Sequence, residues 1–500
     1  MTIPSARIYR KSVALSAITA GSLFLSLGNQ LIIAAMFGVS IEVDTLIAAS
    51  SVPWFVFGIV TAMLNYSGVP VLVRARASDQ TSESFASDLF WSVTALAVGA
   101  TLFGIYATRW YFPLLATERT PVELFHAISV LSWCAAGLGI AGGVLGAIEN
   151  ANNRFQVKAA MSLSPYGGMC VAGLALSKSL GIVSIPLGQL VGHIAAVAIL
   201  FFRNRVYLAR RPRLIKFRGS AIPTLVAALT VLCYSVSGIV DSYWTRLLDA
   251  GSLSSLGFAS RISIAVGSIL VVGPLAILGT RLTELYLAGA TAEFDRSLKN
   301  GLSILVLVSL PALLLSIAVG DELVIAVFER GRFSREASAA VAGLLPLMMA
   351  GMIANLLASL VMKALISVRH TWDAAVMSLV YVVVYAASPS LTIGPWGVKG
   401  MAAVYAIAWW CSLIAGAILL ARSKHIRIEI FGLLKFVARI ALALVGFGVG
   451  IWISNALFHG FGAKEDVFTA SLMAAVVGTA VYAITALLFV YPKISQVDRP

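Results

Sequence analysis

Long apolar segments separated by short polar ones run through the whole sequence. About 20 consecutive apolar residues form a helix long enough to cross the hydrocarbon core of a bilayer. Only 12% of the residues are charged, whereas a water-soluble domain carries roughly a quarter and needs them to cover its surface. Lipid must therefore contact most of the protein surface, and the sequence predicts an all-α polytopic membrane protein.

The apolar segments predict about fourteen transmembrane helices. The first of them follows a basic N-terminal stretch, but it is too long for the apolar region of a cleaved signal peptide, so we interpret it as a retained helix. The helices are expected near residues 12–38, 44–73, 87–115, 122–148, 156–177, 181–202, 220–247, 254–282, 298–320, 338–366, 372–392, 397–421, 432–457 and 466–491.

The basic residues predict the orientation of these helices. An even number of helices places both termini on one side, and if that side is cytoplasmic it receives most of the 36 lysine and arginine residues. This asymmetry is the one that the positive-inside rule describes. We therefore expect an inner-membrane protein with both termini cytoplasmic, whose net charge of +14 faces anionic lipid and not nucleic acid.

The longest basic linker, RNRVYLARRPRLIKFRGS, separates the first six helices from the rest. Asp44 follows the first helix, and Asp241 lies near the end of the seventh. This weak repeat, together with the linker, favours two pseudo-symmetric bundles around a midplane cavity, as in many transporters. The expected parts are an N-lobe of six helices at 1–205, a basic cytoplasmic linker at 206–219, a C-lobe of six helices at 220–425, and two further helices at 426–500.

Motifs for catalysis are missing from the sequence. It contains no P-loop, HExxH or GxSxG, and no GxGxxG after a strand. Its linkers are too short for the acidic metal-binding loops of membrane transferases. The four cysteines and five histidines are scattered without the spacing of a metal site. The sequence therefore predicts a transporter and not an enzyme, with no metal and no ATP hydrolysis.

Arg261 is the clearest ionisable residue inside a predicted span, about two turns into the segment 254–282. A charge in hydrocarbon is costly, so such a residue usually faces a cavity or an acidic partner. Its guanidinium suits an anionic headgroup; the alternative is a side chain that snorkels to the outer headgroups. Asp241 is expected either to pair with Arg261 or bind a coupling cation, or to be an ordinary acid at a helix end.

Many of the predicted helices also contain proline and glycine. These residues kink helices and let bundles rock, which fits a transporter that works by alternating access.

Several strings resemble the MurJ/MviN family of lipid II flippases over essentially the whole chain. In the first half these are MFGVSIEVDTLIAASSVP, GVPVLVRA and LGAIENANNRF. In the second half, VDSYWTRLLDAGSLSSLGFASRISIAVGSILVVGPLAILGTRLTELYLAG, FERGRFSREASAAVAGLLPL and KALISVRHTWDAAVMSLV follow the family's helices seven to eleven.

The resemblance implies a fold and a set of site residues. The family belongs to the multidrug/oligosaccharidyl-lipid/polysaccharide exporter superfamily, whose members rock two lobes about a central cavity without ATP. Arg261 corresponds to the family's cavity arginine, and Asp44 to the acid after its first helix. Asp241 corresponds to the helix-seven acid, which in some members helps to hold a cation. The last two helices would form a groove for the lipid tail.

The first lobe departs from the family pattern. Phe24 and Gln30 stand where the first helix of the family carries basic residues, and WFVFGIVTAMLNYSG replaces a segment with twin arginines and an acid. The asparagine expected near 383–385 is also missing. The predicted substrate-binding residues are therefore Arg261, Asp44, Gln30 and Asn65, with Asp241 for cation coupling. No cofactor is expected, and coupling to Na+ or H+ stays open.

Three hypotheses about function follow from the family resemblance and the departures from it. The first is a flippase that moves an undecaprenyl-pyrophosphate-linked glycan, lipid II or similar, from the cytoplasmic to the periplasmic leaflet of a bacterial inner membrane by ion- or potential-coupled alternating access. The second is a flippase for an exopolysaccharide or O-antigen repeat unit. The third is a scaffold without transport activity in a glycan-assembly complex. The expected partners are the glycolipid, membrane lipids and glycan-assembly enzymes, and the expected state is a monomer.

Overall fold

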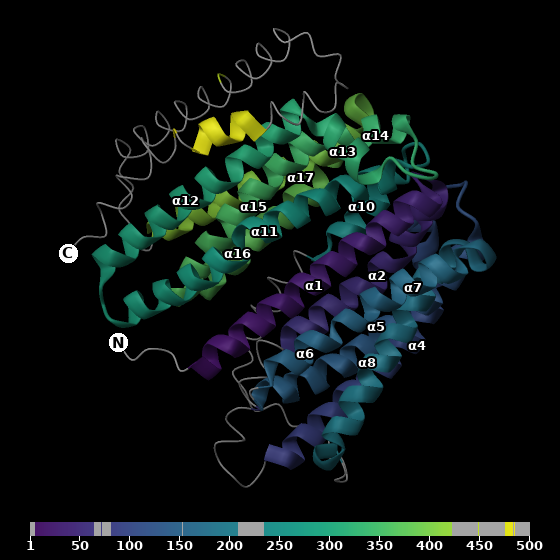
Figure 1. Cartoon of the computed structure of the whole chain (residues 1–500), viewed down its shortest axis with the longest axis horizontal. Coiled ribbons are helices and arrows are strands. Elements are labelled where there is room, and N and C mark those ends of the chain that lie inside the picture. Colours follow the sequence, from purple (N-terminus) through teal and green to yellow (C-terminus); the bar gives the residue numbers. More distant parts are fainter. Residues whose placement is uncertain are drawn as a thin grey trace. The chain divides into compact units, whose positions relative to one another are not determined.

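The computed structural model describes residues 6–64, 72, 82–152, 154–208, 235–422, 449, 476–483 and 485 (Figure 1). All regular structure in these residues is helical. The first half contains α1 (Ala6–Phe37), α2 (Ile41–Met63), α4 (Ser82–Leu115), α5 (Val122–Ala151), α6 (Phe155–Met161), α7 (Leu163–Leu180), the 3-10 turn η2 (Gly181–Val183) and α8 (Ser184–Leu208). The second half contains α10 (Ser237–Thr245), α11 (Ser252–Leu287), α12 (Thr291–Ala318), α13 (Gly320–Phe328), α14 (Arg335–Ala342), α15 (Leu345–Ser367), α16 (Thr371–Ala387) and α17 (Pro389–Arg422).

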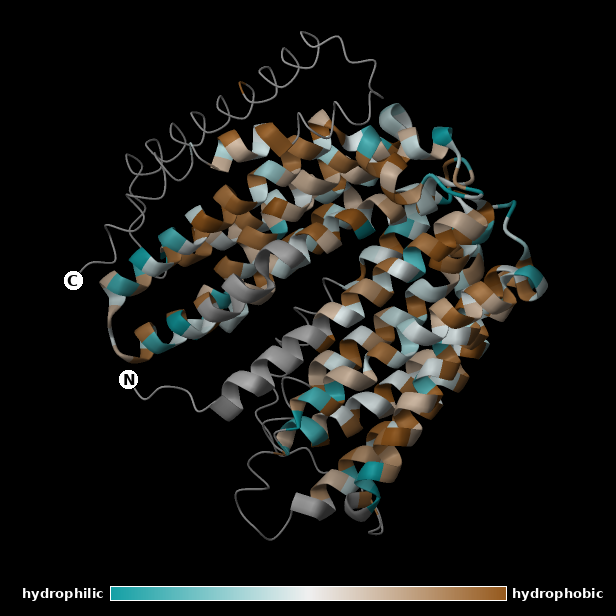
Figure 2. Ribbon diagram, viewed as in Figure 1, coloured by the Kyte–Doolittle hydropathy of each residue, from teal (hydrophilic) through white to brown (hydrophobic). Residues whose placement is uncertain are grey.

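The helices confirm the all-α polytopic membrane fold. Eight helical segments of the described chain are long and apolar enough to cross a membrane. One of them, Phe155–Arg205, has 51 residues, enough for two crossings at 1.5 Å per residue. Gly181 interrupts it with a φ of 57°, between the two helices predicted at 156–177 and 181–202. Apolar residues cover most of the length of the helices in Figure 2, and polar residues gather toward their ends and in the loops.

Some predicted boundaries were wrong for local reasons. The segment predicted as one helix at 338–366 is two helices, α14 and α15, because the chain turns at Gly343 and Leu344 before Pro346 enters the first turn of α15, where proline is favoured. The helix predicted at 397–421 extends back to Pro389, across a kink at Gly397 with a φ of 53°. The nine-residue α13 was not predicted, because it is too short to span a bilayer. The helices predicted at 432–457 and 466–491 lie almost entirely outside the described residues.

The chain divides into two compact units. Unit 1 comprises Met1–Gly257 with Arg330–Ser334, and unit 2 comprises Phe258–Glu329 with Arg335–Pro500. The short segment Arg330–Ser334 joins unit 1 at the end of α1, where the amide of Arg332 donates to the carbonyl of Ala35 over 2.8 Å. The predicted lobe boundaries stay a prediction, because residues 209–219 of the basic linker lie outside the described residues.

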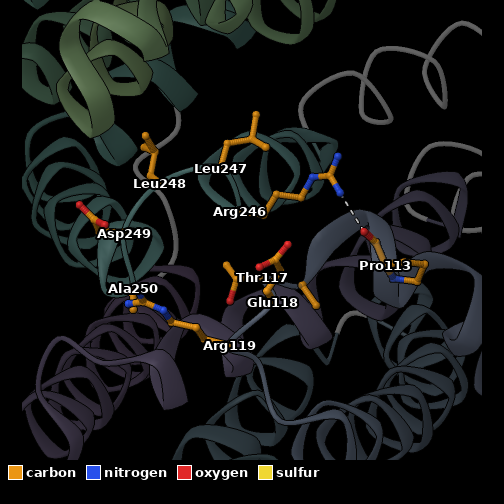
Figure 3. A pocket seen from close by; sticks show the side chains of 10 residues that line it. Pro113, Thr117, Glu118, Arg119, Arg246, Leu247, Leu248, Asp249 and Ala250 are labelled. Carbon is orange, nitrogen blue, oxygen red and sulfur yellow. Dashed lines mark hydrogen bonds between the residues drawn. The ribbon is translucent and has the colours of Figure 1, made fainter.

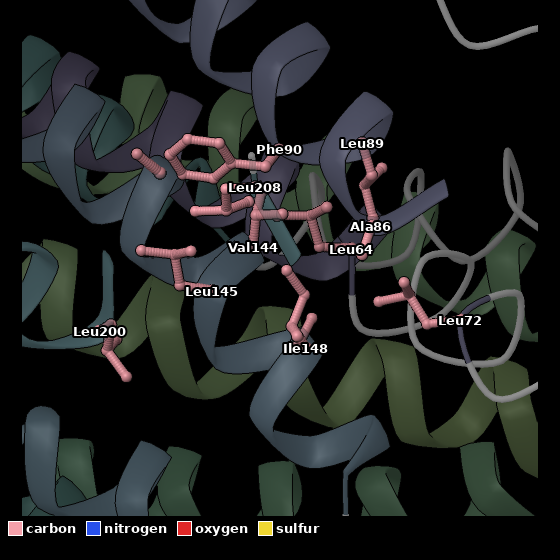
Figure 4. Packing of buried hydrophobic residues seen from close by; sticks show 12 residues of the cluster. Leu64, Leu72, Ala86, Leu89, Phe90, Val144, Leu145, Ile148, Leu200 and Leu208 are labelled. Carbon is pink, nitrogen blue, oxygen red and sulfur yellow. The ribbon is translucent and has the colours of Figure 1, made fainter. Parts of the chain in front are cut away.

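The core of unit 1 forms around α5, which packs against α2, α4 and α8. Figure 4 shows leucine, isoleucine, valine and phenylalanine side chains from α4, α5 and α8 interdigitating at the centre of this cluster. Val144 and Leu145 of α5 are fully buried there. Helices that pass through lipid gain little from the hydrophobic effect on association, so the fit between side chains and backbones must stabilise this bundle.

Unit 2 is organised around α15, which packs against α12 and α17. An aromatic cluster joins α16 to α17: the rings of Tyr381 and Trp409 lie 4.4 Å apart, and those of Tyr381 and Tyr385 stack at 5.4 Å. The hydroxyl of Ser412 in α17 donates to the carbonyl of Met377 in α16 over 2.9 Å. Close packing and an interhelical hydrogen bond thus hold these two helices together.

Glycines allow α7 and α8 to approach backbone to backbone. A Cβ atom added at Gly168 would lie 2.2 Å from the carbonyl oxygen of Gly188 and 3.2 Å from the amide of Gly192, whereas one added at Gly167 would meet nothing within 4 Å. We expect Gly168→Ala to force the helices apart and destabilise the protein by about 1–3 kcal/mol. Thermal unfolding of the purified protein measures this loss, and Gly167→Ala is the control. Equal unfolding temperatures for the two variants would contradict the packing described here.

Candidate substrate site and family

Asp44, a predicted substrate-binding residue, joins α2 to the start of α11. Its side chain is 7% exposed. One carboxylate oxygen accepts from the amide of Gly251 and the other from the amide of Ser254, each over 2.6 Å. A helix N-terminus has unpaired amides and a partial positive charge, so a carboxylate is the appropriate cap. The geometry assigns Asp44 a structural role in unit 1, and both of its oxygens are already engaged by the protein.

Arg261 lies on α11, in the part of that helix that belongs to unit 2. The residue is exposed, while Ile262 and Ser263 beside it are buried. Its guanidinium makes no hydrogen bond or ion pair with any residue that the structure describes. An arginine in an apolar helix with all its donors unused can bind an external anion. The prediction that Arg261 pairs with Asp241 remains untested.

The other predicted site residues belong to the first half of the chain or to α10. Gln30 is half-buried on α1, and Phe24 on the same helix is 75% exposed. Asn65 lies outside the described residues. Asp241 is half-buried on α10, and its backbone carbonyl accepts from the hydroxyl of Thr245 over 2.6 Å. Gln30, Asp44 and Asp241 belong to unit 1 and Arg261 to unit 2.

A pocket of about 640 Å³ opens in unit 1 between the α4–α5 turn and the segment after α10 (Figure 3). The guanidinium of Arg246 crosses it to the carbonyl of Pro113 over 2.8 Å and lies 4.7 Å from the centre of the Tyr243 ring. Glu118, Arg119 and Asp249 complete its charged lining. The sequence alone does not reveal this pocket, because its two walls are more than 100 residues apart in the chain.

Comparisons with known proteins identify the family. A family model described as "Lipid II flippase MurJ" matches residues 33–487. The chain belongs to the MurJ family of lipid II flippases. This confirms the resemblance found in the sequence. Because flippases are transporters, membership in the MurJ family also agrees with the prediction of a transporter in place of an enzyme.

Individual members and neighbours of the MurJ family show how far the similarity extends. A probable lipid II flippase MurJ from Buchnera aphidicola subsp. Acyrthosiphon pisum (strain APS) is 30% identical over 122 residues, which are 24% of this chain and 23% of that protein. The matched part is thus about a quarter of the length of that curated relative. A solved lipid II flippase MurJ in an inward closed conformation has a TM-score of 0.79 at 18% identity, over 96% of this chain and 100% of that chain.

The fold is shared beyond the MurJ family. An inward-facing multidrug resistance MATE family transporter of the MOP superfamily has a TM-score of 0.66 at 12% identity, over 82% of this chain and 98% of that chain. At these identities the solved structures establish the fold alone. The chain therefore has the fold that MurJ and MATE transporters share, and its substrate must be argued from its own residues.

Proposed function

We propose that this protein moves an undecaprenyl-pyrophosphate-linked glycan, lipid II or a close relative, from the cytoplasmic to the periplasmic leaflet of a bacterial inner membrane. The observation that carries the proposal is the family match over residues 33–487. The exposed Arg261 on α11, with no partner among the described residues, supports it, because a guanidinium fork binds phosphate oxygens in pairs.

The transport cycle that we propose is alternating access coupled to a Na+ or H+ gradient or to the membrane potential. The absence of any nucleotide-binding motif in the sequence supports coupling without ATP. Asp241 is the proposed cation-coupling residue, because it is an acid on an apolar helix. We further propose that the protein acts as a monomer beside the glycan-assembly enzymes that make and use its substrate.

A second candidate substrate is the repeat unit of an exopolysaccharide or O-antigen that is linked to undecaprenyl through a group with less negative charge than a diphosphate. The observation that favours it is on α1, where Phe24 is 75% exposed and Gln30 is uncharged at the positions where the family resemblance implies basic residues. A diphosphate needs several cations to balance its charge. A first lobe with fewer arginines therefore suits a substrate with a different headgroup.

A growth experiment separates the two substrates. The resident lipid II flippase of a host bacterium is depleted while this protein is expressed from a plasmid. Rescue of growth is the expected result for a lipid II flippase, and an empty plasmid is the control. Two results together would favour the second substrate over lipid II. The host cells would lyse although the protein is inserted normally, and deletion of its gene from the native strain would remove surface polysaccharide.

The proposed orientation places both termini and the basic linker at 206–219 in the cytoplasm, because most of the basic residues then lie on that side. A single cysteine introduced at Arg210 of a cysteine-free variant should not react with a membrane-impermeant maleimide in intact cells. The same reagent should label it after the cells are opened. Labelling in intact cells would show that the whole protein has the opposite orientation in the membrane.

A further inference from the structure

A carboxylate that lies fully inside unit 1 holds two arginines at one end of its bundle. Glu149, near the end of α5, has a side chain with 0% exposure. Its Oε1 accepts from Nε of Arg203 and from Nδ2 of Asn204, both on α8 and each over 3.0 Å. Its Oε2 lies 3.9 Å from Nη1 of Arg154, which is too far for a hydrogen bond.

The cluster carries more positive charge than Glu149 can balance. One carboxylate faces two guanidinium groups, that of Arg203 at 3.0 Å and that of Arg154 at 3.9 Å. A pair between Glu149 and Arg203 would by itself satisfy the charge of the buried acid. Arg154 is therefore a cation in excess of what the ion pair requires.

The arginines keep unused donors at the surface. The side chain of Arg203 is 43% exposed and that of Arg154 is 46% exposed. Glu149 engages only Nε of Arg203, so the terminal nitrogens of both arginines have no hydrogen-bond partner among the residues that the structure describes. Because Glu149 fixes the plane of the Arg203 guanidinium, this donor fork is oriented before any ligand arrives.

Each arginine has an exposed aromatic neighbour in the sequence. Phe155 follows Arg154 and is 47% exposed, and Phe202 precedes Arg203 and is 69% exposed. At the end of a membrane bundle an exposed phenylalanine faces acyl chains, and a long arginine side chain reaches the headgroups. A soluble anion would gain nothing from these rings, whereas a lipid contacts them with its acyl chains.

We propose that Arg154 and Arg203 bind the phosphate of an anionic membrane phospholipid, with Glu149 as the positioning residue and Phe155 and Phe202 against the acyl chains. The site lies within unit 1 and does not include Arg261. The proposed orientation places it on the cytoplasmic side of the membrane.

Native mass spectrometry of the purified full-length protein tests this site with phosphatidylglycerol and phosphatidylcholine as probes. Arg154→Gln should weaken phosphatidylglycerol binding roughly tenfold and leave phosphatidylcholine binding unchanged. Folding should persist, because Glu149 keeps both of its hydrogen bonds.

Arg205→Gln is the matched control, since it removes the same charge from an exposed position of α8, and it should change binding less than about twofold. Equal losses in the two variants would overturn the site in favour of general attraction by surface charge.

Two further measurements test which ligand occupies the site at Arg154 and Arg203. Arg154→Lys keeps the charge without the planar fork and should retain part of the binding, which keeps the proposal testable even if the glutamine variant fails to fold. Full binding by Arg154→Lys would contradict recognition through a guanidinium fork. Inorganic pyrophosphate at the concentration of the lipid should not displace phosphatidylglycerol. Displacement would show that the site binds a free diphosphate, and the assignment to a membrane phospholipid would be wrong.

Discussion

Replacing Arg261 with alanine is expected to abolish export of the lipid-linked substrate while the protein still folds and inserts. The side chain is exposed and has no partner among the described residues, so its removal should change the free energy of unfolding by less than about 0.5 kcal/mol. An arginine that does not stabilise the fold and lies within an apolar helix is retained for a ligand. Lysine should restore only part of the activity, because it supplies the charge without the bidentate fork.

The measurement for Arg261 is export per correctly inserted molecule. Arg281→Ala is the matched control, because Arg281 is an exposed arginine on the same helix and is expected near the cytoplasmic end of the span. Export by the Arg281 variant should remain near that of the unaltered protein. If Arg261→Ala exports at the full rate, Arg261 does not contact the headgroup, and the main reason to prefer a phosphate-linked substrate disappears. Lysine as effective as arginine would instead indicate a snorkelling side chain.

Replacing Asp44 with alanine is expected to give the largest loss of stability. The change leaves the amides of Gly251 and Ser254 buried at the start of α11 without their acceptors. Each buried donor that loses its partner costs about 1–3 kcal/mol, so the free energy of unfolding should fall by roughly 2–6 kcal/mol in total. Asp44→Asn keeps one acceptor oxygen and should lie between alanine and the unaltered protein.

Thermal unfolding of the purified protein measures the Asp44 effect. Glu42, on the same turn of α2, provides a control. Its side chain is 41% exposed, and its Oε2 lies 3.7 Å from Nη1 of Arg332. An ion pair with this distance and exposure contributes at most about 1 kcal/mol to stability. Glu42→Gln should therefore change the unfolding temperature little. If Asp44→Ala unfolds at the same temperature as Glu42→Gln, the carboxylate does not stabilise the start of α11, and a role at the substrate becomes the better explanation.

The two residues show what the sequence could and could not predict. Arg261 stood out because a charge in an apolar segment is costly wherever the helix packs, and it has no hydrogen bond or ion pair among the described residues. The cap made by Asp44 could not be predicted, since its partners are more than 200 residues away in the chain. Glu149 was hidden in the same way, because its partner Arg203 lies on a different helix.

Helix prediction succeeded where length and composition decide the outcome. A continuous apolar run forms a helix in a membrane because the hydrocarbon offers its backbone no hydrogen-bond partners. This predicted both ends of α5 within three residues and the C-terminal ends of α1 and α12 within two. The predicted helix bounds were wrong where a local turn or kink interrupts an apolar run. The turn at Gly343 and the kink at Gly397 lie inside apolar runs, where hydropathy does not change although the backbone does.

Translocation in reconstituted vesicles tests the central proposal most directly. Purified protein is incorporated into vesicles that contain fluorescent lipid II, and the fraction in each leaflet is measured without a gradient and with an imposed membrane potential. We expect transfer that needs no ATP and that requires Arg261. With a potential of 100 mV we expect accumulation in one leaflet, since each charge moved through that potential contributes about 2.3 kcal/mol, up to roughly fiftyfold per charge. Vesicles that transfer lipid II no faster than protein-free vesicles, with or without the potential, would show that the protein is not a lipid II flippase.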